Sequence, residues 1–126
     1  MTQVVYDAGV LVAADRSDRS VWADHRVRLE AGIVPVVPAP VIAQVSRSPA
    51  QAQLRRMLRG CEVVSLTEQR AHAAGQLQGR AGTADVVDAV VAQTAAVLQA
   101  DVVTSDRADI RRLLDAADAS SQILDV

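Results

Sequence analysis

Short runs of β-branched residues alternate with longer stretches of helical periodicity along this chain, and that alternation limits its fold more than any other feature. The runs predict strands over residues 3–7, 33–37, 62–66, 102–104 and 122–124. The stretches between them predict helices over residues 8–14, 17–31, 40–47, 50–59, 67–80, 84–99 and 106–116. Because crossovers between parallel strands are right-handed, this order predicts an α/β fold with three α/β/α layers and a mostly parallel central sheet.

The length and composition agree with this architecture. A chain of 126 residues predicts a single domain, residues 1–126. Its apolar residues are mostly Val, Ala and Leu, with no Phe, which suits helices packed on Val-rich parallel strands. The single cysteine, Cys61, leaves no partner for an internal disulfide or a multi-cysteine zinc site. The first apolar run is short, interrupted and not preceded by basic residues, so we expect a cytoplasmic protein with no membrane partner.

Aspartates lie where such a fold carries its ligands. Asp7 directly follows the run VVY, and Asp106 directly follows the run VVTS. In open parallel sheets, ligands bind outside the carboxyl ends of the strands, so both side chains are predicted at the functional edge. Asp85 and Asp88 lie three residues apart at the start of the most apolar predicted helix, where that spacing places them on one face.

These carboxylates predict a divalent cation. A carboxylate on an apolar helix is costly unless it is paired or bound to a cation, and no basic residue lies within four positions of Asp88. Converging carboxylates repel each other, and a hard cation such as Mg²⁺ relieves the repulsion because it takes oxygen ligands. Because such a site activates water and neutralises phosphodiester charge, the pattern points to metal-assisted phosphoryl chemistry.

Each aspartate also has a purely structural interpretation. Asp7 and Asp106 are placed to cap the helices that follow them, with Asp109 as a first-turn acid favoured by the helix dipole. Asp85 falls in the first turn of its predicted helix. Asp88, which we place beyond the first turn, is the hardest to explain by helix chemistry alone.

Four segments together resemble the PIN-domain family and, within it, the VapC-like toxin nucleases of bacterial toxin–antitoxin operons. VVYDAGVLVAADR resembles the first strand, metal aspartate and following helix of that family, and PVVPAPVIAQVSR its second strand and next helix. ADVVDAVVAQTA resembles its third acidic motif, and DVVTSDRADIRRL its fourth strand with the terminal aspartates. The four segments occur in the family's order and cover essentially the whole chain.

The resemblance implies an endoribonuclease that depends on Mg²⁺ or Mn²⁺ and cleaves an RNA substrate. It implies Asp7, Asp88 and Asp106 as the catalytic and metal-binding residues, with Asp109 as a rival to Asp106 and Asp85 as a further candidate. It also implies a homodimer and a small antitoxin protein that inhibits the toxin. Thr104 and Ser105 would orient the carboxylates or the substrate.

One position departs from the family pattern. The short helix after the second strand normally carries a glutamate, and this chain has Gln44 there. An amide oxygen can still bind a metal, but it carries no charge and cannot act as a base. The alternative function is therefore a catalytically weakened or inactive PIN-like module that binds RNA or a partner protein. A receiver-like phosphoacceptor domain also gathers aspartates, but by family analogy it requires a lysine, and the chain has none.

Every basic side chain is an arginine, and the formal net charge is −2, so the overall charge does not by itself predict nucleic-acid binding. Four arginines surround one predicted helix: Arg47, Arg55, Arg56 and Arg59. A solvated face explains this cluster, and a rim that contacts phosphates is the functional alternative. Arg80 and Arg107, which flank the predicted site in sequence, are the better candidates for substrate phosphates.

Overall fold

Strands and helices alternate in the predicted order, and the computed structural model describes them over residues 2–126. The strands are β1 (Val4–Tyr6), β2 (Val36–Pro38), β3 (Glu62–Val64), β4 (Asp101–Thr104) and β5 (Ile123–Asp125). The helices are α1 (Ala8–Asp15), α2 (Arg19–Glu30), α3 (Ala39–Val45), α4 (Ala52–Arg59), α5 (Glu68–Ala81), α6 (Val86–Leu98) and α7 (Arg107–Ala116). Each predicted element is present, and only its ends differ from the prediction.

The central sheet has the order β3-β2-β1-β4-β5, and each neighbouring pair is parallel. The chain builds one side of the sheet outward from β1 through β2 to β3, and then crosses to the other side of β1 to form β4 and β5. The strand order therefore reverses between β1 and β4, where a crevice opens at the carboxyl ends of the strands. Asp7 and Asp106 follow these two strands.

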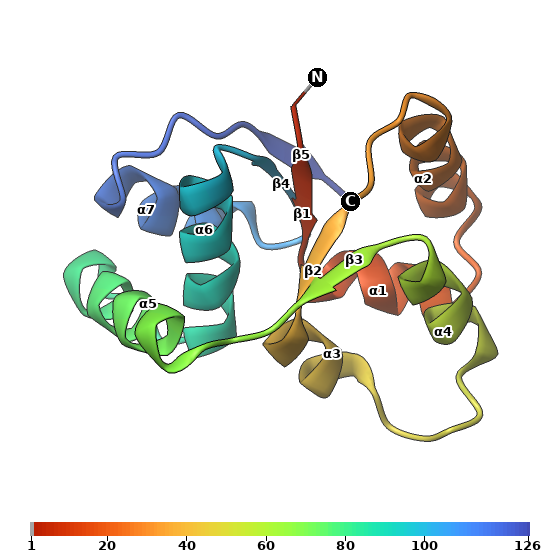
Figure 1. Cartoon of the computed structure of the whole chain (residues 1–126), viewed down its shortest axis with the longest axis horizontal. Coiled ribbons are helices and arrows are strands. Elements are labelled where there is room, and N and C mark those ends of the chain that lie inside the picture. Colours follow the sequence, from red (N-terminus) through yellow and green to blue (C-terminus); the bar gives the residue numbers. More distant parts are fainter. Residues whose placement is uncertain (1) are drawn as a thin grey trace.

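Helices cover both faces of the sheet, which confirms the predicted three layers. Figure 1 shows α5, α6 and α7 on one face and α1, α2 and α4 on the other. Helix α6 packs against β1, β2 and β4, while α1 contacts β1 and β4 from the opposite face. Helix α3 contacts both α1 and α6, so it closes the carboxyl end of the sheet between the two layers.

Strand β2 begins later than predicted, at Val36 instead of residue 33, and it includes Pro38. The N–H of Ile33 is used by the end of α2, where it donates to the Arg28 carbonyl at 2.9 Å. Pro35 has no N–H to donate to a neighbouring strand. Pro38 is tolerated because it is the last residue of the strand and leads directly into α3.

The start of α6 corrects two predictions. The helix begins at Val86 rather than residue 84, and Asp85 is its N-cap, with Oδ1 accepting from the N–H groups of Val87 at 2.8 Å and Asp88 at 3.2 Å. Asp85 is therefore the N-cap and not a first-turn acid, because its short side chain accepts hydrogen bonds from the free N–H groups of the first turn. Asp88 consequently lies in the first turn, not beyond it.

The core consists of small aliphatic side chains, with one buried polar group at the side of α2. His25 is 3% exposed, and its Nδ1 lies 2.8 Å from the Tyr6 hydroxyl, which also accepts from Arg28 at 3.1 Å. Burial raises the pKa of Tyr6 to about 12. Within residues 2–126, no single helix is long and apolar enough to cross a membrane, and α5 with α6 passes that test only as a pair bent by 108°.

Candidate metal centre and its acidic pocket

Asp7 is fixed at the carboxyl end of β1 by bonds to both the chain that follows it and the neighbouring strand. Its N–H continues the sheet by donating to the Val103 carbonyl at 3.0 Å. Its Oδ1 accepts from the N–H of Ala8 at 2.7 Å, and its Oδ2 accepts from the Thr104 hydroxyl at 2.6 Å. The structural interpretation therefore holds, since Asp7 caps α1, but its second oxygen is held toward β4.

Burial raises the pKa of Asp7, and the hydrogen bonds from Thr104 and Ala8 act against that rise. The charges of Asp106 and Asp85 raise it further. The side chain is only 3% exposed. Asp7 is therefore a buried carboxyl group in an acidic neighbourhood, and two hydrogen bonds fix its orientation.

Asp106 occupies the N-cap position of α7, yet its side chain makes no capping hydrogen bond. Its N–H donates to the Thr104 hydroxyl at 2.9 Å, so one threonine links the ends of β1 and β4 through Asp7 and Asp106. A carboxylate at a helix N-cap normally accepts from the first free N–H groups. Capping therefore does not account for the carboxylate of Asp106, which lines a pocket instead.

Asp88 carries the strongest electrostatic signal in the site. It is 4% exposed, and its buried Oδ2 has no hydrogen-bond partner among the described residues. Burial, the adjacent Asp106 carboxyl and the charges of Asp7 and Asp85 raise the pKa of Asp88 to about 8. An orphaned, buried carboxylate oxygen with this surrounding charge is the arrangement that a bound cation would stabilise.

The carboxylates converge from three elements. One oxygen each from Asp88, Asp106 and Asp109 lie within 4.8 Å of one another. A pocket of about 390 Å³ at the same place is lined by Asp7, Asp85, Asp88 and Asp106. Asp88 and Asp106 belong to both sets, Asp7 and Asp85 only to the pocket lining, and Asp109 only to the close group of three oxygens. All of these donors are oxygens, which suits Mg²⁺ or Mn²⁺.

Gln44 of α3 lies in the acidic pocket, at the place where the resemblance expects a glutamate. Ser105 also lines the pocket, and Gly9 of α1 packs against it so closely that a Cβ at Gly9 would lie 2.8 Å from the Ser105 Cβ. Sequence reasoning missed this role of Gly9. The sequence did contain a sign of it, because a glycine within a predicted helix often marks a place where another segment packs closely.

The arginine at this pocket differs from the prediction. Arg107 is paired with Asp125 at 2.9 Å and also donates to the Ile123 carbonyl, and neither Arg107 nor Arg80 lines the acidic pocket. Arg47, from the predicted surface cluster, does line it. The rotation of α7 directs Arg107 to the edge strand β5, which sequence proximity to Asp106 does not reveal.

A family model described as PIN domain matches residues 4–114 of the chain. The match includes each of the converging aspartates. A search among curated proteins finds no match.

Several solved structures share the fold at low sequence identity. The structure of VapBC2 from Rickettsia felis bound to a DNA fragment from its promoter has a TM-score of 0.75 and 14% identity, covering 98% of each chain. DNA-bound VapBC from Salmonella typhimurium has a TM-score of 0.71 and 15% sequence identity, and the match covers 99% of this chain and 98% of the other. A toxin–antitoxin complex from Klebsiella pneumoniae has a TM-score of 0.66 and 18% sequence identity, and the match covers 84% of this chain and 88% of the other.

Proposed function

The chain belongs to the PIN domain family, and on that premise we propose that it is a metal-dependent endoribonuclease and the toxin of a bacterial toxin–antitoxin pair. Members of this family are generally nucleases. The observation that carries the proposal is the unpartnered, buried Oδ2 of Asp88 beside the oxygens of Asp106 and Asp109. A purely structural carboxylate would be expected to have found a donor.

The residues present fit a divalent cation, with Asp88 and Asp106 as ligands and either Asp7 or Asp109 as the third. When bound, Mg²⁺ or Mn²⁺ would neutralise phosphodiester charge and make water a better nucleophile. Burial and the neighbouring aspartates raise the pKa of Asp88 to about 8, so a proton and a cation compete for this cluster of carboxylates. Loading of the site therefore releases a proton from the cluster, and affinity for the cation should increase with pH.

The remaining residues hold the carboxylates in place. Thr104 fixes one oxygen of Asp7 and the backbone of Asp106 with a single hydroxyl. Asp85 is engaged with the N–H groups at the start of α6, so it contributes negative charge and anchors the turn that carries Asp88. Arg47 is the positive group at the pocket, suited to a substrate phosphate.

Gln44 supports a second candidate function, a PIN-like module with weak or no catalysis that binds RNA or a partner protein. Its neutral side chain lines the acidic pocket, so the site has one negative charge fewer than the family pattern. A cation would then be held less tightly, because ligand charge contributes directly to affinity.

We further propose that residues 1–126 act as one domain in the cytoplasm, as a homodimer held inactive by a small antitoxin. Support comes from the resemblance to the VapC-like group and from the solved structures above, one of which is a toxin–antitoxin complex. Co-expression with the product of a small neighbouring gene, followed by co-purification, tests the partner. Light scattering on the purified chain tests the dimer.

The first test of activity is cleavage of a mixed single-stranded RNA pool with Mg²⁺ or Mn²⁺. We expect cleavage that is lost with EDTA and in Asp88→Ala, but retained in Asp24→Ala, a matched change of an exposed aspartate on α2. Comparison of Asp7→Asn with Asp109→Asn then decides the third ligand. A folded protein that leaves RNA intact with either metal, but gains cleavage in Gln44→Glu, would favour the second candidate function.

A further inference from the structure

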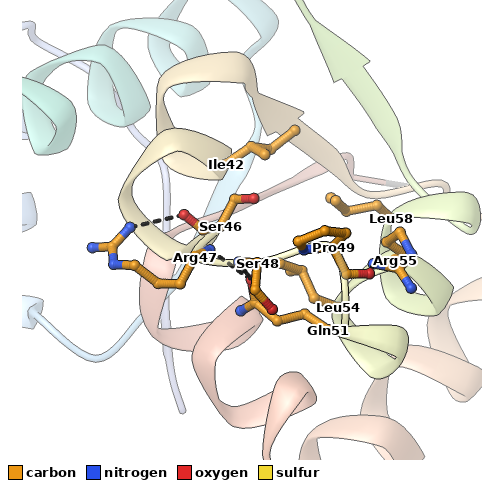
Figure 2. A pocket seen from close by; sticks show the side chains of 9 residues that line it. All are labelled: Ile42, Ser46, Arg47, Ser48, Pro49, Gln51, Leu54, Arg55 and Leu58. Atoms are coloured by element: carbon orange, nitrogen blue, oxygen red, sulfur yellow. Dashed lines mark hydrogen bonds between the residues drawn. The ribbon is translucent and has the colours of Figure 1, made fainter.

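A second pocket adjoins the acidic one between α3, the α3–α4 connection and α4. Its volume is about 620 Å³, and its lining includes Arg47, Ser48, Pro49, Leu54 and Arg55. We name it the α3–α4 pocket. Figure 2 shows Arg47 extending on one side and Arg55 on the other, with Pro49 and Leu54 between them.

Arg47 joins the two pockets, because it lines both the acidic pocket and the α3–α4 pocket. It lies just beyond the end of α3, three residues after Gln44, which lines the acidic pocket alone. An extended ligand that runs from the carboxylates past Arg47 therefore enters the α3–α4 pocket directly. This continuity connects the second pocket to the proposed site of cleavage.

The charged residues that line the α3–α4 pocket are both positive. Its lining contains Arg47 and Arg55 and no acidic residue. Among residues 2–126, neither arginine forms a salt bridge with a carboxylate. Both guanidinium groups are instead held by backbone carbonyls: Arg47 donates to Ala43 at 3.2 Å and Ser46 at 3.0 Å, and Arg55 donates to Pro49. Carbonyl contacts orient a guanidinium but leave its charge available.

The connection that carries this pocket is fixed by one side chain. The Gln51 amide oxygen accepts from the N–H groups of Arg47 at 2.6 Å and Ser48 at 3.0 Å. Its amide nitrogen donates to the Val45 carbonyl at 3.0 Å and to Asp15 at 3.1 Å. The connection is therefore ordered before any ligand arrives, which reduces the entropy cost of binding.

We propose that the α3–α4 pocket binds the nucleotide next to the scissile phosphate of a single-stranded RNA, with Arg47 and Arg55 contacting its flanking phosphates. The proposal rests on the nuclease function above and identifies the pocket in which part of the RNA substrate binds. Leu54, Leu58 and Pro49 provide an apolar floor for the ribose and base. The lining has no aromatic residue on which a base could stack, so we expect the arginine–phosphate contacts to provide most of the affinity.

Binding is measured without cleavage, in the Asp88→Asn background with Mg²⁺ present, by fluorescence anisotropy of a single-stranded RNA of mixed sequence and about ten nucleotides. We expect Arg47→Gln and Arg55→Gln each to weaken binding and to reduce the slope of log affinity against log salt by about 0.7 to 1. Arg70→Gln, a half-buried arginine on α5 that lines neither pocket, is the matched control and should leave both quantities unchanged. Arg47→Lys and Arg55→Lys should retain most of the slope, because they keep the charge.

Three outcomes overturn the proposal: equal weakening in Arg70→Gln, no change in either pocket variant, or a change of oligomeric state in the pocket variants with RNA binding intact. The last outcome would assign the pocket to a protein partner. Thermal unfolding checks that each variant is folded, and Arg47→Met or Arg55→Met, which also removes the charge, replaces any glutamine variant that is not. If the unmodified protein fails to cleave RNA but binds it through Arg47 and Arg55, the nuclease function fails and the binding pocket stands. If it cleaves through Asp88 while Arg47→Gln behaves as Arg70→Gln, only the pocket fails.

Discussion

Replacement of Asp88 by asparagine should make the metal-free protein more stable, although it removes a proposed metal ligand. Within residues 2–126, the buried Oδ2 of Asp88 has no hydrogen-bond partner, and the carboxyl group faces the negative charges of neighbouring aspartates. Asparagine has nearly the same shape but no charge, and its amide can donate to a neighbouring carboxylate. The substitution therefore removes repulsion without opening a cavity, and such conflicts between stability and function are common at active sites.

Burial of the charge and the neighbouring carboxylates both raise the pKa of Asp88, so the repulsion alone sets a lower limit on the effect. Two unit charges no more than 4.8 Å apart repel by at least about 3.5 kcal/mol at an effective dielectric constant of about 20. Water reaches the partly exposed Asp106 and Asp109 and screens this repulsion to about 1 to 3 kcal/mol, and the cost of burying the charge adds to that gain. For a chain of this size, each kcal/mol corresponds to a rise in Tm of about 3–5 °C.

The gain depends on pH in a direction that the pKa fixes. In the fold the pKa of Asp88 is raised from 3.8 to about 8, so the folded protein keeps a proton that the unfolded chain loses. The native protein has its full stability from this group below about pH 4 and loses it as the pH rises to about 8. Asparagine does not ionise, so the advantage of the variant should grow across that window and level off above it.

Urea unfolding of the metal-free native protein, Asp88→Asn and Asp24→Asn from pH 5 to pH 9 measures the effect. Added Mn²⁺ at about 100 times its Kd should stabilise the native protein and Asp24→Asn by about 2.7 kcal/mol and Asp88→Asn far less. If Asp88→Asn is less stable than the native protein at pH 9, and gains as much from Mn²⁺, then Asp88 is neither repelled in the fold nor a metal ligand.

Three further substitutions test other contacts of the site. Gln44→Glu should lower the Kd for Mn²⁺ in calorimetric titration, because it adds the charge that the family pattern carries, and an unchanged Kd would show that residue 44 does not contact the cation. Gly9→Ala should cost about 1–3 kcal/mol in urea unfolding, since the new Cβ would lie 2.8 Å from the Ser105 Cβ; a native midpoint would mean that the backbone relaxes there at no cost. Thr104→Val should cost about 1–3 kcal/mol and lower cleavage, because it leaves an oxygen of Asp7 without its donor; unaltered cleavage would limit Thr104 to a structural role.

Local patterns were sufficient to predict much of this protein. The residue types Asp and Thr favour helix caps, and the side chains of Asp18 and Thr67 indeed accept from N–H groups in the first turns of α2 and α5. The alternation of strands and helices predicted the parallel sheet, and the position of Asp7 and Asp106 after their strands predicted which edge of the sheet is acidic. These features depend on periodicity and on neighbours along the chain, which the sequence displays directly.

The convergence of side chains from distant elements was decided by the tertiary structure. The approach of Asp109 to Asp88, the pairing of Arg107 with β5 instead of the site, and the shared position of Arg47 between two pockets depend on how α3, α6 and α7 rotate about their axes. Those rotations follow from packing against the sheet and against each other. The sequence by itself thus determined which elements form and which edge of the sheet is acidic, because those depend on local periodicity and strand order. Only the packed fold decided which carboxylates share a site and which arginine accompanies them, because a small rotation of a helix moves a side chain from one pocket to another.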